Sequence, residues 1–174
     1  MANDEPIEQE FGQPRLLEII ISPGHDYWVK RGQPPLQHGA TSVASVVCLA
    51  GRGLRGDRYS EKSGGHKAQV TLMSSSVVDE IRRRFDVPDL PAQVFRRNLI
   101  VSGICLAGLV GQRFQIQGVE FEGTEECRPC RWMDRMVADG AHAFMKENFR
   151  GGLRAKILND GVLTAEARRV RPAD

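Results

Sequence analysis

Two cysteines three positions apart, Cys127 and Cys130, are the residues of this chain with the clearest chemical potential. They follow a strand pattern and precede a helical one, which places Cys130 at or near a helix start. Unpaired N–H groups at a helix start favour a thiolate over a thiol, and the flanking Arg128 and Arg131 act in the same direction. The segment therefore offers a sulfur that could be a soft metal ligand or a nucleophile. The alternative is an inert buried thiol or an incidental pair.

Other types of cysteine site fit the chain less well. A closed zinc site needs four ligands, and the sequence has one Cys-x-x-Cys with no second pair. Cys-Arg-Pro-Cys is also typical of a thioredoxin-type redox pair, but the βαβ pattern of that fold is missing upstream. Ligation of a metal by one thiolate, with an open coordination position, remains. Cys48 and Cys105 lie in apolar runs, and we expect both in the core.

The composition is that of an ordinary soluble protein. At 174 residues, with 41% hydrophobic and 26% charged residues, the chain is long enough for one domain with its own core. A net charge of +2 gives no drive toward nucleic acid or an anionic membrane. The acidic start is unlike a secretory signal, and no apolar run could span a bilayer. We expect a cytoplasmic protein with a polar tail over residues 1–14 and a single domain over residues 15–174.

The pattern of apolar residues predicts many short strands and few helices. Strands are expected over residues 16–21, 41–49, 67–73, 95–101, 114–116, 119–121, 153–158 and 162–170, and helices near 75–85 and 131–148. This content favours a mainly β protein, a single β-barrel-like domain with a few peripheral α-helices. Ser76 and Asp79 resemble a capping box, and Asp139-Gly140 could split the second helix. A parity change at Gly118 predicts a bulge or tight turn, and residues 159–161 predict a turn between the last two strands.

Two polar segments could contribute to a site. Residues 51–59 contain three glycines within six positions, which indicates positive φ angles or close approach of the backbone to another group. Their spacing fits neither a Walker loop nor a dinucleotide fingerprint. Residues 24–40 form a long predicted loop whose His25, His38, Lys30 and Arg31 could line a site.

Taken in order, four stretches of the chain resemble the MOSC domain, the module named after the C-terminal part of molybdenum-cofactor sulfurase. They are residues 53–58, 95–104, 128–130 and 150–152. The resemblance extends over roughly residues 40–170. It implies a mainly β barrel with a few peripheral helices, in agreement with the pattern of strands, and it implies binding of the molybdenum cofactor.

The resemblance also implies roles for individual residues. Cys130 stands at the position of the thiolate ligand to molybdenum, which makes it both the metal ligand and the catalytic residue. Arg96 and Asn98 match the residues expected to hold the cofactor's phosphate or pterin. Asp57 and Arg58 either shape the same pocket or stabilise a turn.

The chain departs from the family pattern at Cys127 and in the closing strands, which have Ala165-Glu166 where the family usually has Gly-Asp. Reductase relatives often have Thr where this chain has Cys127, so Cys127 is a second thiol near the metal, a resolving thiol or a bystander. Those relatives also clamp the cofactor with a second domain, so the pocket here is open unless a homo-oligomer covers it.

Three functions are compatible with the resemblance. The first is a molybdenum-dependent oxidoreductase that reduces N-hydroxylated compounds with electrons from a separate electron-transfer protein. The second is a sulfur carrier that receives a persulfide from a cysteine desulfurase. The third is a module that binds or stores the cofactor without catalysis. In the sulfurase, pyridoxal phosphate belongs to a separate domain, so we do not expect it on this chain.

Overall fold

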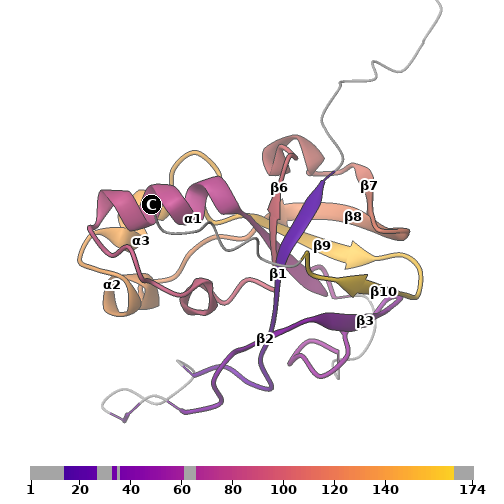
Figure 1. The fold of residues 1–174 in the computed structure, drawn as a ribbon, viewed down its shortest axis with the longest axis horizontal. Helices are drawn as coiled ribbons and strands as arrows, with labels where there is room; N and C mark the ends of the chain where they lie inside the picture. The colour runs from indigo at the N-terminus through magenta and orange to yellow at the C-terminus, as the bar shows by residue number, and fades with distance from the viewer. Residues whose placement is uncertain (1–13, 27–32, 35, 61–65, 167–174) are drawn as a thin grey trace, which may run out of the picture.

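The computed structural model describes residues 14–26, 33–34, 36–60 and 66–166. In this part of the chain, strands form a seven-stranded sheet of order β2-β1-β6-β5-β9-β8-β7 and a three-stranded sheet of order β10-β3-β4. The larger sheet curls into a half-barrel, and the α-helices lie beyond one end of it, opposite β7 (Figure 1). The predicted fold class, mainly β with a few peripheral helices, is confirmed.

The larger sheet consists of β1 (Arg15–Ile21), β2 (Thr41–Val43), β5 (Val70–Ser74), β6 (Leu99–Ser102), β7 (Arg113–Ile116), β8 (Val119–Glu126) and β9 (Leu153–Ile157). The smaller sheet consists of β3 (Ser45–Leu49), β4 (Gly53–Leu54) and β10 (Gly161–Thr164). The helices are α1 (Ser75–Arg84), α2 (Trp132–Met136) and α3 (Ala141–Met145), with short 3-10 helices η1 (Ala92–Phe95) and η2 (Leu106–Leu109). Adjacent strands are antiparallel except β5 and β6, which are parallel.

Two hydrophobic cores lie on the two faces of the larger sheet. Leu72 and Leu99 belong to the core that the two sheets share, whereas Met73 and Ile100 face the core beneath the helices. Central strands with both faces covered need continuous apolar sequence, which is what β5 and β6 have. The larger sheet therefore separates the two cores.

Three strand predictions need correction. The strand expected over residues 95–101 begins only at Leu99, because Phe95 ends η1 and Arg96 has a left-handed backbone. The segment predicted as one strand over residues 41–49 breaks at Ala44, so that β2 joins the larger sheet and β3 the smaller. The last two strands do not form a hairpin either, because β9 pairs with β5 and β8 while β10 pairs with β3. The turn between them crosses from one sheet to the other. It is anchored by side chains: Asn159 accepts a hydrogen bond from Glu120 N at 2.7 Å and Asp160 accepts one from Ala50 N at 2.7 Å.

The expected turns at two glycines are confirmed. Gln117 and Gly118 have φ angles of 50° and 83° and join β7 to β8, as in a two-residue hairpin of type I′. Gly140, with φ of 88°, separates α2 from α3.

The capping box and the position of Cys105 were predicted wrongly. Helix α1 begins at Ser75, directly after β5, so Ser76 lies inside the helix and Ser74 is the N-cap without a side-chain cap bond. The Ser74 and Ser76 hydroxyls pair with each other at 2.8 Å instead. Cys48 is buried as expected, but Cys105 is exposed at the start of the η2 turn.

Some predictions lie outside the described residues, namely most of the tail over residues 1–14 and the end of the strand expected to reach residue 170. Among the helices that are described, none combines the length and the apolar character that crossing a membrane requires.

Candidate functional site

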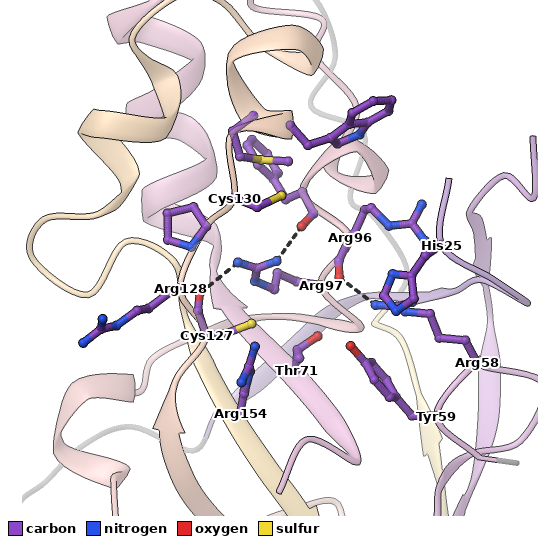
Figure 2. Close-up of a pocket in the computed structure, with 14 residues that line it drawn as sticks. His25, Arg58, Tyr59, Thr71, Arg96, Arg97, Cys127, Arg128, Cys130 and Arg154 are labelled. Carbon is purple, nitrogen blue, oxygen red and sulfur yellow. Dashed lines mark hydrogen bonds between the residues drawn. The ribbon is translucent and has the colours of Figure 1, made fainter. Parts of the chain in front are cut away.

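One pocket brings together side chains from six separate stretches of the chain (Figure 2). It offers about 500 Å³ of space, part of which is open to solvent. It is lined by His25, Arg58, Tyr59, Thr71, Phe95, Arg96, Arg97, Cys127, Arg128, Pro129, Cys130, Trp132, Met133 and Arg154. Because the lining comes from loops, from η1 and α2, and from strands β5 and β9, the pocket forms only where these separate segments pack together.

The pocket is strongly cationic. Its lining includes five arginines, Arg58, Arg96, Arg97, Arg128 and Arg154. No aspartate or glutamate is among the described residues that line it. Guanidinium groups bind phosphate and carboxylate in a forked geometry, so such a wall favours an anionic ligand.

Carboxylates balance part of this charge from outside the lining. Asp57 pairs with Arg58 at 3.3 Å, Asp26 with Arg96 at 3.2 Å and Glu125 with Arg154 at 2.8 Å. These pairs orient the guanidinium groups. Arg97, in contrast, is held by backbone carbonyls, so its charge has no carboxylate partner within the described part of the chain.

Arg97 fixes residues 127–130, which we call the cysteine segment, to the rest of the pocket. Only 8% of the residue is exposed. Its guanidinium donates to Gly151 O at 2.7 Å, Phe95 O at 2.8 Å and Cys127 O at 2.9 Å. Three segments far apart in sequence therefore meet at one side chain, which sets the position of the residues that follow Cys127.

Two glycines allow this close packing. A Cβ atom on Gly151 would collide with the carbonyl oxygen of Cys127. Gly152 has a φ of +90°, and a Cβ atom there would collide with Leu72 O. Gly152 O also accepts a hydrogen bond from Cys127 N at 2.7 Å. The residues matched as 150–152 in the sequence thus support the cysteine segment from behind.

Both sulfurs lie in the pocket, but in different surroundings. Cys130 is exposed and precedes the N-cap Arg131 of α2, as the predicted position near a helix start requires. Cys127 is only 5% exposed. Figure 2 shows the Arg97 guanidinium between the two sulfurs, with Cys127 directed toward Arg154. Cys130 is thus the accessible thiol and Cys127 the enclosed one.

Arg154 interacts with the enclosed thiol. Burial lowers the pKa of Arg154, but attraction to Cys127 and Glu125 and hydrogen bonds with both outweigh it. The pKa of Arg154 therefore lies above its ordinary value. A permanent cation therefore lies beside the enclosed Cys127.

Asn98 does not line the pocket. Only 2% of the residue is exposed, and its side-chain oxygen accepts hydrogen bonds from the N–H and the hydroxyl of Thr71, both at 3.0 Å. Its amide nitrogen donates to Ile20 O and to Asp57 Oδ1, both at 3.1 Å. Asn98 therefore ties β1, β5 and the Asp57 segment together behind the pocket.

Asp57 is buried in the same network. It is 2% exposed and also accepts a hydrogen bond from Ser22 N at 3.0 Å. The glycines around it have positive φ angles, 69° at Gly51, 142° at Gly53 and 85° at Gly56, so the expectation for this loop is confirmed. Asp57 holds the loop that presents Arg58 to the pocket.

The sequence hypothesis requires Arg96, Asn98 and Cys130 to line one cavity; Arg96 and Cys130 line the same pocket, whereas Asn98 does not. The Arg96 backbone adopts the left-handed conformation, with φ of 56°, and its guanidinium donates to Asp26, Ser22 and Gly24 O. A non-glycine residue in this conformation costs on the order of 1–3 kcal/mol and is often found at functional sites. Arg58 donates to Arg96 O at 3.4 Å and so supports the strained residue.

Several lining residues were not predicted. The sequence named His25, which lines the pocket, and His38, which does not; Lys30 and Arg31 lie outside the described residues. The resemblance assigned a role to Arg96 and none to its neighbour Arg97, which also lines the pocket. Arg154 alternates with apolar residues along β9, so the sequence indicated only that its side chain lies on the opposite face of the strand from theirs.

The chain resembles known proteins in its fold more than in its sequence. No curated protein matches the sequence. Among solved structures, the chain is similar to the YuaD protein of Bacillus subtilis, with 15% identity, a TM-score of 0.64, and coverage of 88% of this chain and 93% of that one. It is also similar to YiiM of Geobacillus stearothermophilus (15% identity, TM-score 0.64, 87% and 71% coverage) and YiiM of Escherichia coli (15% identity, TM-score 0.60, 87% and 66% coverage). At this identity the likeness establishes the fold.

The family model of the MOSC domain matches residues 60–169, more than half of the chain. The match includes the segments that carry Arg96, Cys130 and Arg154. Because this model covers more than half of the chain, the chain belongs to the MOSC domain family.

Proposed function

We propose that this chain binds the molybdenum cofactor in the described pocket and reduces N-hydroxylated compounds. The observation that carries the proposal is an exposed thiol, Cys130, at a pocket whose lining holds five arginines. A thiolate is a soft ligand suited to a metal that the cofactor binds through sulfur. The guanidinium groups suit the cofactor's phosphate. The chemistry of these side chains therefore fits the group.

The proposal divides the residues into three roles. Cys130 holds the metal, and Arg58 and Arg96 present positive charge to the anionic part of the cofactor. Arg97 keeps the cysteine segment in place through its three carbonyl bonds. Asn98 and the Asp57 carboxylate act at a distance, because their hydrogen bonds hold the strands and the loop behind the pocket.

Once bound, the cofactor supplies the two-electron chemistry that removes oxygen from the substrate. Reduction of an N-hydroxyl group consumes two electrons and two protons and releases water. The electrons come from a separate protein. His25 and Tyr59, which line the wall of the pocket beside Arg58, are the groups we expect to hold protons for transfer.

A second candidate is a sulfur carrier, favoured by the presence of two thiols in one open pocket. The Cys130 thiolate would attack the outer sulfur of a desulfurase persulfide, and the desulfurase cysteine would leave as a thiolate. Cys127, beside Arg154, would then act as the resolving thiol.

The experiment compares the metal content of four proteins purified from a host that makes the cofactor. These are the wild type, Cys130→Ala, Cys127→Ala and Cys105→Ala, the last being a control for an exposed thiol outside the pocket. We expect Cys130→Ala to lose molybdenum and the other two variants to retain it. Reduction of an N-hydroxylated base should be lost together with the metal.

The opposite pattern would decide for the carrier. Wild-type protein that contains no molybdenum but accepts a persulfide on Cys130 from a cysteine desulfurase would overturn the reductase proposal. Retention of molybdenum by Cys130→Ala would show that this thiol is not the ligand.

A further inference from the structure

The surface beside the pocket opening has a distinct composition. Arg128, Arg131 and Arg135 are exposed, Met136 is 37% exposed and Trp132 is half-buried. We call these five residues the mouth patch. Arg131, Trp132, Arg135 and Met136 lie on one side of α2, because they are linked by separations of three and four positions, which are neighbours on a helix. The opposite side of α2 is anchored by the buried Met133.

The positive charge of the mouth patch is available for an external partner. Within the described part of the chain, no carboxylate forms an ion pair with Arg128, Arg131 or Arg135. Arg135 stacks on the Trp132 ring, 5.0 Å from its centre. Asp134, the acidic residue inside the same helix, is half-buried and accepts a hydrogen bond from His142 N at 2.8 Å.

Figure 2 separates Arg128 from the other pocket arginines. Its guanidinium extends away from the cluster formed by Arg97 and Arg154, although the residue contributes to the lining. Arg128 therefore contributes to the edge of the pocket, while its charged end points away from the other pocket arginines.

The residue types indicate a protein partner. Arg, Trp and Met are enriched in protein–protein interfaces, where charged residues surround a less polar centre. Nucleic acid would require a longer basic surface, whereas the whole chain has a net charge of only +2.

We propose that the mouth patch docks an acidic electron-transfer protein, which delivers the electrons that the proposed reductase function needs. This inference rests on the proposed function, because only a reductase needs electrons from such a partner. Complementary charge accelerates encounter and fixes orientation, and it suits a partner that must bind and leave in each cycle. Docking here places the partner beside Cys130, the exposed thiol of the pocket.

The test measures binding of a purified flavodoxin, a small acidic flavin protein, at low and at high ionic strength. The first variant is Arg131→Glu/Arg135→Glu, neither of which lines the pocket. The matched control is Arg55→Glu/Arg113→Glu, which makes the same change of charge at two other exposed arginines. We expect the first variant to bind flavodoxin about tenfold more weakly or worse at low salt, and the control to change affinity less than about twofold. Wild-type binding should weaken as salt is raised.

The result that would overturn the inference is equal binding by the wild type and the first variant, or an equal loss in the control. Absence of flavodoxin binding to the wild type would also overturn it, as would tighter binding of a DNA duplex through the same arginines. Molybdenum content is measured on the same preparations. Wild-type protein that contains molybdenum but does not bind flavodoxin contradicts this inference alone, whereas metal-free wild-type protein contradicts the proposed function, whatever binds to the mouth patch.

Discussion

The two sides of the pocket are built in different ways. On the sheet side, Asn98, Asp57 and Thr71 form a buried network that satisfies its own hydrogen bonds. On the loop side, Cys130 is exposed, and the cysteine segment is held by Arg97 and by close packing against glycines. The residues matched to a family motif therefore divide into those that position the site and those that are available for chemistry.

This difference predicts which substitutions should lower stability and which should change function. A buried polar network contributes to stability mainly because removing one member leaves the others unsatisfied. An exposed thiol contributes little to stability and can be replaced at little cost. We therefore expect stability and function to respond to different residues, although both sets surround one pocket.

The largest effect on folding should come from Asn98→Leu. The change keeps the branched shape and the number of heavy atoms of the side chain but removes four hydrogen bonds, leaving the N–H and the hydroxyl of Thr71 without their acceptor in the interior. We expect the free energy of unfolding to fall by about 3–5 kcal/mol, measured by urea denaturation. A loss under about 1 kcal/mol would show that the sheet side is not held by this network.

Arg97→Met should have the next largest effect. It removes the bonds to three carbonyls that link Gly151, Phe95 and Cys127. We expect a loss of about 2–4 kcal/mol, together with faster alkylation of the enclosed Cys127 in the native protein. Arg97→Lys is the matched control, since it keeps the charge but cannot supply the forked geometry. Unchanged alkylation of Cys127 in Arg97→Met would contradict the proposal that Arg97 holds the cysteine segment in place.

Arg150→Met should have a smaller effect that depends on pH. Arg150 binds both oxygens of Glu80, at 2.9 and 3.1 Å, and so joins the segment after α3 to α1. The side-chain hydrogen bond from Arg150 is the main cause that lowers the pKa of Glu80. A lowered carboxyl pKa stabilises the fold above the ordinary value of 4.5, and this contribution is lost as pH falls through the folded-state pKa.

Because the pair is partly exposed, we expect Arg150→Met to cost about 1 kcal/mol or less at neutral pH. The difference from the wild type should shrink in acid, as measured by thermal unfolding at a series of pH values. A difference that grows as the pH falls would have the wrong sign for this pair.

Cys130→Ser should change stability least, by less than about 0.5 kcal/mol. It should nevertheless remove one of the two thiols that react quickly with iodoacetamide in the native protein, the other being the exposed Cys105. Cys48 should stay unmodified until the protein unfolds, since burial raises the pKa of its thiol to about 12. Mass spectrometry of labelled peptides distinguishes the sites, and early labelling of Cys48 would contradict the described core.

The sequence was sufficient for the class of fold, because alternating apolar residues specify strands locally. It was not sufficient for strand partners: nothing near Ala44 signals that the chain passes from one sheet to the other. The sequence also predicted that Arg96 and Cys130 share a pocket, through their match to a family pattern. It could not show that Asn98 lies behind the wall or that Arg97 binds carbonyls, because both depend on contacts between distant segments.

The place of β9 in the larger sheet has a consequence for the order in which the protein folds. This strand lies near the end of the chain in sequence but between β5 and β8 in the sheet. Until it is inserted, the β7–β8 hairpin cannot join the other strands, and the carbonyl of Gly151 cannot reach Arg97. Pairing of such distant segments is slow because the intervening chain must first be closed into a loop. During synthesis, the thiol of Cys127 should therefore remain accessible until the last strands have left the ribosome, which makes the nascent chain more sensitive to oxidants than the finished protein.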